Sequence, residues 1–341
     1  MENIIKAAVE RGASDIHIKA GDVFRARIDG ELKALTKQRL TPEQTKAIAL
    51  RVIPTETDRE RIDEIRDYDC SWGAPGVGRF RVNILRQRSS FMIVMRVIPF
   101  EVPSLDKLNL PPVLGAIAEA ERGLVLVSGP AGSGKTSTMA AILHHLNSTQ
   151  TRHVVALESP IEFLHRDVNA SITQREVGVD TESWPIGLRA ALRQDPDVIL
   201  VGQVPDTETM DLALTAAESG YLIIAGMPSA TVLAAVDRVV AAFPTEDQDV
   251  ARARLAAALR AIVAQRLLPR ADGEGRCAAA EVLVATDEVR EAIRNRKGGK
   301  RLMELMASDD EHGMITFAQN VADLVGAGLV SEDTAKAVGG V

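Results

Sequence analysis

The feature that most constrains the fold is the segment "GLVLVSGPAGSGKTSTMAAILHHL" (123–146). Its pattern predicts an apolar strand, then a glycine-rich loop, then a helix. Glycines in such a loop let several backbone N–H groups converge on one anion, and the start of the helix adds partial positive charge. The loop fits the pattern G-x-x-x-x-G-K-[ST], so it predicts a phosphate-binding loop. A chance glycine-rich turn is the alternative, and the strand–loop–helix context argues against it.

Within this loop the polar side chains have distinct expected roles. Lys135 would reach the β- and γ-phosphates of a nucleotide, and the Thr136 hydroxyl would ligate Mg²⁺. The candidate nucleotide-binding residues of the loop are Gly129, Pro130, Ala131, Gly132, Ser133, Gly134, Lys135, Thr136 and Ser137.

A second segment, "DPDVILVGQVPD" (195–206), resembles the strand that follows such a loop in nucleotide hydrolases. Residues 198–201 form an unbroken apolar run, as expected for a central parallel strand. A strand of this kind usually delivers an acid to the metal and the phosphate. Here Gly202 ends the run and Gln203 follows. An amide cannot take up a proton near neutral pH, so this strand does not supply a general base.

Composition narrows the function classes. The chain has 341 residues, enough for two domains, and its 46% hydrophobic and 26% charged residues are ordinary for a globular protein. The formal net charge of −7 argues against nucleic acid as the main partner. Cys70 and Cys277 are far apart and form no CxxC motif, which predicts two reduced thiols. We expect no secretory signal and no membrane span.

The pattern changes along the chain and suggests domain boundaries. Residues 1–98 mix helical and alternating strand patterns, including two strands joined near 87–90 and a hairpin turn at Asp29-Gly30. The proline-rich stretch "PFEVPSLDKLNLPP" (99–112) predicts an extended linker. Strands and helices then alternate over 113–285, which predicts an α/β domain with a parallel sheet. Residues 286–341 are expected to be mainly helical.

Further strings accompany these two segments: "GASDIHI", "GRFRVN", "VMRVIP", "LESPIEFLH" and "ALRAIVAQRLLPR". Together they resemble the type IV pilus and type II secretion motor ATPases, and among them the PilT-like retraction branch that drives twitching motility. The resemblance covers almost the whole chain. It implies an N-terminal PAS-like α+β domain (1–98), followed by a RecA-like P-loop NTPase domain with a parallel sheet.

The resemblance also implies cofactors, partners and site residues. ATP and Mg²⁺ would be the cofactors. The protein would form cytoplasmic hexamers, or mixed rings with a paralogue, at the inner-membrane pilus platform protein. Glu158 would assist the attacking water, and Arg79, Arg81 and Arg96 would stabilise charge. Solvated strand arginines are the alternative for these three. Glu162 is a nearby second acid, for which a solvated charge or helix cap is the alternative.

The chain departs from the family pattern at several positions. Gln203 stands in place of Glu, Pro205 in place of Arg and Ser159 in place of Asp, while Tyr221 and Pro228 replace two histidines. We expect these losses to surround one γ-phosphate, with the binding loop intact. The pattern suggests that binding has been separated from hydrolysis, because losing a general base alone lowers the rate by about 10²–10⁴.

Three functions follow as hypotheses. The first is a PilT-like ATPase that uses Glu158 as base. The second is a ring subunit that binds ATP, hydrolyses little or none and works beside a competent paralogue. The third is a RecA-like nucleic-acid motor, which the acidic balance disfavours and salt-dependent DNA binding would revive. The rate at which the purified protein hydrolyses ATP distinguishes the first hypothesis from the second.

Overall fold

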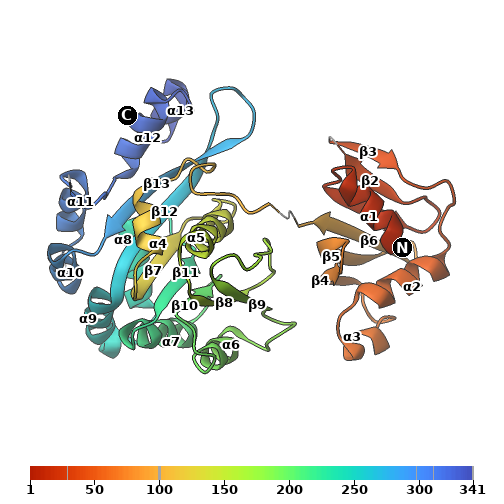
Figure 1. Cartoon of the computed structure of the whole chain (residues 1–341), viewed down its shortest axis with the longest axis horizontal. Helices are drawn as coiled ribbons and strands as arrows, with labels where there is room; N and C mark the ends of the chain where they lie inside the picture. Colours follow the sequence, from red (N-terminus) through yellow and green to blue (C-terminus); the bar gives the residue numbers. More distant parts are fainter. Residues whose placement is uncertain (29, 99–100, 297, 310, 340–341) are drawn as a thin grey trace. The chain divides into compact units, whose positions relative to one another are not determined.

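The computed structural model describes residues 1–28, 30–98, 101–296, 298–309 and 311–339. The chain divides into two compact units (Figure 1). Unit 1 comprises Met1–Glu101 with Pro160–Leu164, and unit 2 comprises Val102–Ser159 with His165–Val341. The expected turn residue Asp29 and part of the expected linker (99–100) lie outside the described residues.

Unit 1 is an α+β unit built on one six-stranded antiparallel sheet of order β3-β2-β1-β6-β5-β4. Its elements are α1 (Glu2–Glu10), β1 (Asp15–Lys19), β2 (Arg25–Ile28), β3 (Glu31–Ala34), α2 (Pro42–Val52), α3 (Glu56–Glu60), β4 (Asp67–Ala74), β5 (Gly78–Gln87) and β6 (Ser90–Val97). Helix α2 begins at Pro42, because Thr41 and Gln44 form a capping box around its first turn and proline is well suited to the first helical position.

The sheet of unit 1 has two different faces. Alternate residues of its strands, such as Phe80, Val82 and Ile84 on β5, are buried against apolar residues of α1 and α2. The intervening residues point to the opposite face, where β5 carries Arg79 and Arg81. This alternation is the period of two that a sheet with one covered face requires.

Unit 2 contains a seven-stranded sheet of order β13-β12-β7-β11-β10-β8-β9, in which all strands are parallel except β13, which pairs antiparallel with β12. Its strands are β7 (Gly123–Ser128), β8 (His153–Glu158), β9 (Ser171–Glu176), β10 (Val198–Val201), β11 (Leu222–Met227), β12 (Leu259–Pro269) and β13 (Arg276–Val284). Its helices are α4 (Val113–Ala118), α5 (Lys135–Thr149), α6 (Trp184–Ala191), α7 (Thr207–Glu218), α8 (Val232–Ala241), η1 (Thr245–Asp247), α9 (Gln248–Ala258), α10 (Asp287–Arg294), α11 (Gly299–Ala307), α12 (Phe317–Gly326) and α13 (Glu332–Ala337). The expected α/β class with a parallel sheet is confirmed.

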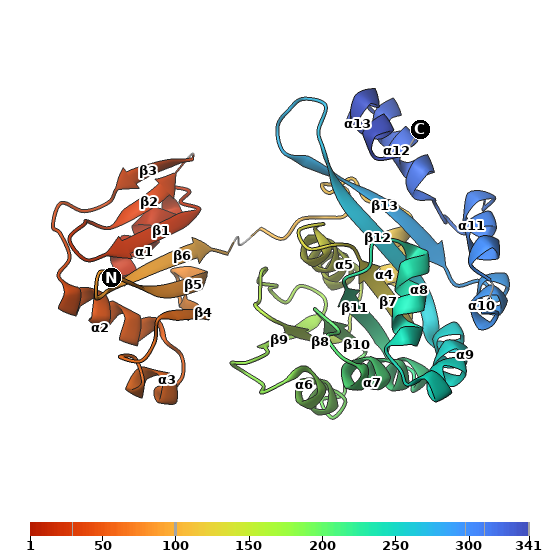
Figure 2. The same cartoon turned by 180° about the vertical axis from the view of Figure 1, so that it is seen from behind.

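Helices cover both faces of this sheet. Helices α4 and α5 pack on one face, seen toward the viewer in Figure 1. Helices α6 to α9 pack on the other, which Figure 2 shows from behind. Central strands β7, β10 and β11 are buried along their whole length, which explains their continuous apolar runs.

The C-terminal part of the chain contains the four helices α10 to α13. Helices α12 and α13 pack against the ends of β12 and β13 through a small apolar cluster that includes Leu268, Ala279 and Val321. In the portion of the chain that the structure describes, every helix is too short or too polar to span a bilayer.

Candidate nucleotide-binding site

The glycine-rich loop connects β7 to α5, as the sequence predicts. Strand β7 ends at Ser128, and α5 begins at Lys135 after Gly134 in a left-handed conformation (φ 88°). Gly129 also has positive φ (152°), and a Cβ atom there would collide with the Ser133 side chain and the Gln265 carbonyl oxygen. Only glycine therefore fits this position, and the chain can wrap tightly enough to present its backbone N–H groups at the start of α5.

Lys135 lies over this loop. Its Nζ donates hydrogen bonds to the carbonyl oxygens of Gly129 (2.8 Å) and Pro130 (2.9 Å). Burial lowers the pKa of the Lys135 ammonium below its usual value. A phosphate group at the loop would offer this cation an anionic acceptor in place of two neutral carbonyls, which is a stronger interaction.

A residue that the sequence analysis missed supports the loop from the side. Gln265 on β12 is buried, and its Nε2 donates a hydrogen bond of 2.7 Å to the carbonyl oxygen of Ser133. Its Oε1, like the Ser128 and Ser133 hydroxyls, is buried without a hydrogen-bond partner among the described residues. The only local signal was one uncharged polar residue inside the apolar stretch "AIVAQRLL".

The two candidate catalytic residues, Glu158 and Gln203, lie at the carboxyl ends of neighbouring strands. Glu158 is the last residue of β8, and its carboxylate accepts a hydrogen bond of 2.7 Å from Gln174 Nε2. The Gly202 N–H, just beyond β10, donates to the Leu157 carbonyl oxygen (2.8 Å). Gln203 follows this contact with an exposed side chain. Parallel strands place these residues at the same edge of the sheet as the phosphate loop.

Strand β11 separates the two positions expected to replace histidines. Met227 pairs with Ser128, so Pro228 follows at the edge that carries the phosphate loop. Tyr221 precedes the strand at the opposite edge, where its carbonyl oxygen accepts from the Gly123 N–H (3.0 Å). Six strand residues separate the two positions by roughly 20 Å. The expectation that Tyr221 borders the γ-phosphate is therefore wrong, and its ring packs on the apolar core instead.

The residues at this edge fit a magnesium–nucleotide pair better than a metal held by protein alone. Thr136 lies in the first turn of α5, and its hydroxyl makes no hydrogen bond within the described chain. Among the described residues no group of three His, Cys, Asp or Glu side chains converges as a metal site. Mg²⁺ usually takes one or two protein ligands and completes its shell with phosphates and water. Thr136, and Gln203 at the same edge of the sheet, are the residues that would supply those ligands.

The three candidate arginines all belong to the sheet of unit 1. Arg81 on β5 pairs directly with Arg96 on β6, and Arg79 lies two residues away on the same face. The Arg96 guanidinium donates to Asp15 on β1 with an Nε–Oδ1 distance of 2.9 Å, yet its side chain remains 72% exposed. The structure gathers these arginines on one face of one sheet, and Asp15 neutralises part of their charge.

Comparison with known proteins decides the family. The family model described as "Type II/IV secretion system protein" matches residues 1–324. The chain belongs to this family. It is 36% identical to the type IV pilus retraction ATPase PilT of Pseudomonas aeruginosa over 333 residues, which cover 98% of this chain and 96% of that protein. It is 38% identical to the type IV pilus ATPase PilU of the same organism over 339 residues, covering 98% and 87%.

A solved structure of this secretion family has the same fold. The crystal structure of the pilus retraction motor PilT with bound ADP superimposes with a TM-score of 0.87 at 40% identity, covering 98% of this chain and 95% of that chain. The resemblance to motor ATPases and the RecA-like fold are thus confirmed.

Proposed function

We propose that the chain is an ATP-binding, PilT-like subunit of a type IV pilus motor in which hydrolysis is slow. One observation carries the proposal: the phosphate loop has every residue of its motif, whereas the end of β10, at the same edge of the sheet, offers an amide at Gln203. Lys135 and the loop would bind the phosphates, and Thr136 would hold Mg²⁺ when it enters with ATP. Mg²⁺ would neutralise charge on the phosphate oxygens.

Glu158 is the acid left to orient the attacking water. It lies at the correct edge of the sheet, but its carboxylate already accepts a hydrogen bond from Gln174. Gln203 can hold a water molecule through its amide without accepting a proton. Without the second carboxylate, hydrolysis would fall by about 10²–10⁴ relative to a complete site.

A second candidate is a ring subunit that binds ATP without hydrolysing it and works beside a competent paralogue. Pro228 favours this candidate, because it places a residue with no side-chain donor beside the loop, where the family pattern has histidine. Both candidates share the same partners: other copies or a paralogue in a six-membered ring, and the inner-membrane pilus platform protein. In both, the protein would work in the cytoplasm at the base of the pilus, and Arg79, Arg81 and Arg96 would serve nucleotide at subunit boundaries.

The deciding experiment is steady-state phosphate release by the purified full chain with Mg-ATP, beside calorimetric titration of Mg-ATP. Lys135→Ala is the baseline for both measurements, and the surface variant Lys37→Ala is the matched control. Slow release that Lys135→Ala abolishes supports the first candidate. Binding without release above that baseline supports the second. Mg-ATP affinity that is equal in wild type and Lys135→Ala refutes both.

A further inference from the structure

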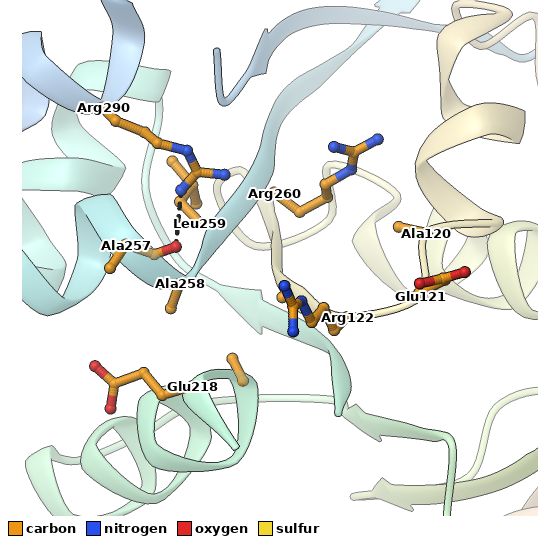
Figure 3. A pocket seen from close by; sticks show the side chains of 11 residues that line it. Ala120, Glu121, Arg122, Glu218, Ala257, Ala258, Leu259, Arg260 and Arg290 are labelled. Atoms are coloured by element: carbon orange, nitrogen blue, oxygen red, sulfur yellow. Dashed lines mark hydrogen bonds between the residues drawn. The ribbon is translucent and has the colours of Figure 1, made fainter. Parts of the chain in front are cut away.

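A cavity of about 560 Å³ opens in unit 2 at the sheet edge opposite the phosphate loop (Figure 3). It is formed where β7 and β12 begin and where α7 and α9 end. Three arginines line it: Arg122, Arg260 and Arg290. In Figure 3 the guanidinium groups of Arg122 and Arg290 point toward the middle of this space, while the Glu121 carboxylate points away from it.

Arg260 and Arg290 are half-buried cations with few anionic neighbours. Arg290 donates from Nη1 to the Ala256 and Ala257 carbonyl oxygens at the end of α9, the latter at 2.8 Å. Burial lowers the pKa of Arg290. The charge of Asp287 opposes this effect in part, and the charges of Arg260 and Arg294 lower the pKa further by smaller amounts. The Nε of Arg260 is buried and has no hydrogen-bond partner in the described part of the chain. Such groups are stabilised by an anion.

The acids around the cavity do not satisfy these arginines. Glu218 is engaged by Arg254, whose Nε and Nη2 donate to both of its carboxylate oxygens at 2.9–3.1 Å. Glu121 is exposed to solvent. Asp287, in the first turn of α10, is exposed as well. Across the described residues, neither Arg122 nor Arg260 forms an ion pair within 4.0 Å.

A second cavity of about 470 Å³ shares Arg260 and Arg290 with the first. Its other walls include apolar side chains of Val113, Ile117 and Val284, together with Asp287 and His312. Arg260 and Arg290 therefore lie between the two cavities. The first cavity adds a third cation, Arg122, and the second adds a less polar wall. Each of the two cavities falls within the size range of small-molecule sites, roughly 300–1,000 Å³.

We propose that this paired cavity is a second anion site, which binds a phosphate-bearing small molecule at the edge of the sheet remote from the phosphate loop. Phosphate fits because several guanidinium groups can share its oxygens through paired hydrogen bonds. The apolar wall would receive the organic part of an organic phosphate, whereas inorganic polyphosphate would use the arginines alone.

Calorimetric titration of the full-length protein tests this site, with inorganic pyrophosphate and AMP as probes at low ionic strength. The Lys135→Ala variant is the background, because it weakens binding at the phosphate loop. Arg260→Gln and the exposed Arg122→Ser are introduced singly into it, and the exposed Arg276→Ser on β13 is the matched control. Arg122→Ser keeps the test valid if Arg260→Gln does not fold.

We expect one pyrophosphate or AMP per chain in the Lys135→Ala background, and about tenfold weaker binding in each of the two cavity variants but not in Arg276→Ser. Tighter binding of AMP would identify an organic phosphate as the ligand, and tighter binding of pyrophosphate an inorganic one. Failure of both probes to bind this background, or binding that survives both cavity substitutions, overturns the proposal.

Discussion

Gln265 and Ser133, 132 positions apart in the chain, are joined by a buried hydrogen bond of 2.7 Å from the glutamine Nε2 to the serine carbonyl oxygen. This bond ties strand β12 to the loop that would hold phosphate. Two glycines of the loop lie against Gln265: a Cβ at Gly129 would collide with its carbonyl oxygen, and a Cβ at Gly134 would lie 3.1 Å from its Nε2. The loop is therefore shaped by a neighbouring strand as well as by its own sequence.

Gln265→Met should loosen the phosphate loop. Methionine has a similar length but no donor, so the buried Ser133 carbonyl oxygen would lose its partner at a cost of about 1–3 kcal/mol in unfolding free energy. Mg-ATP affinity should fall as well, because the loop would have to be ordered on binding. Urea unfolding and calorimetry measure the two effects. Gln248→Met removes a partly buried bond to Phe243 O away from the loop and should leave affinity unchanged. Unchanged affinity in Gln265→Met would contradict the proposed support.

His165 should make unit 2 less stable in mild acid. Burial, with a smaller contribution from the nearby His144, lowers the pKa of His165 to about 4, and its Nδ1 is buried without a partner in the described chain. A depressed histidine pKa favours the neutral form in the folded state. Stability is therefore full above pH 6.5 and is lost as the pH falls toward 4, by about 2–3 kcal/mol. Unfolding free energy measured across this range should show the loss in wild type and not in His165→Gln. The exposed His312→Gln is the control, and parallel wild-type and His165→Gln profiles would refute the assignment.

Glu281 should give the stability of unit 2 the opposite pH dependence: stability should fall as the pH rises. It is buried on β13, and its carboxylate accepts a hydrogen bond from the Val232 N–H at the start of α8. Burial raises the pKa of Glu281, against smaller opposing effects of this hydrogen bond and of Arg266. A raised carboxyl pKa means that stability is full below pH 4.5 and falls as the pH rises through the folded-state value.

Glu281→Gln keeps an acceptor for Val232 and removes the buried charge. We expect the variant to be more stable than wild type at pH 7, with the difference vanishing near pH 4. Thermal unfolding at both pH values measures it, with the exposed Glu291→Gln on α10 as control. A variant that is less stable at pH 7 would show that the negative charge favours the start of α8 more than burial opposes it.

The parts of the site that the sequence predicted are those encoded over a few consecutive residues. The strand–loop–helix around Lys135 and the strand before Gln203 depend on local apolar runs and glycines, and both were placed correctly. Gln265 reaches the loop because β12 pairs with β7, more than a hundred positions away in the chain. Glu281 contacts Val232, 49 positions away. A pattern of neighbouring residues does not encode either contact.

Tyr221 also shows that spacing along the sequence does not give the position of a residue in the sheet. It is only seven positions from Pro228 in sequence, and motif spacing alone grouped both around one phosphate. An extended strand lies between them and carries them to opposite edges of the sheet. Only the pairing of β11 with β7 reveals which of the two borders the phosphate loop.

Because Pro228 borders the phosphate loop and Tyr221 does not, of these two only Pro228 is expected to limit the effect of a change at Gln203. Restoring a carboxylate with Gln203→Glu should raise phosphate release by less than the about 10² that a well-placed base contributes. A base must first lie within reach of its water, and Pro205 constrains the segment that positions residue 203. Proline fixes φ, lacks an N–H and directly precedes Asp206, the residue that caps α7. Pro228, beside the phosphate loop, removes a second polar group.

The combined variant Gln203→Glu with Pro205→Arg and Pro228→His should therefore exceed the product of the three single rate gains, because neighbouring groups act as a unit. Adding Tyr221→His should change nothing, since that position lies at the far edge of the sheet, and this variant is the matched control. The measurement is steady-state phosphate release by each purified variant, with Lys135→Ala as the baseline. If wild type already turns over at the rates of its motor relatives, or if Gln203→Glu alone reaches them, then Gln203, Pro205 and Pro228 do not jointly limit hydrolysis. A gain from Tyr221→His alone would show instead that the opposite edge of the sheet takes part in the reaction.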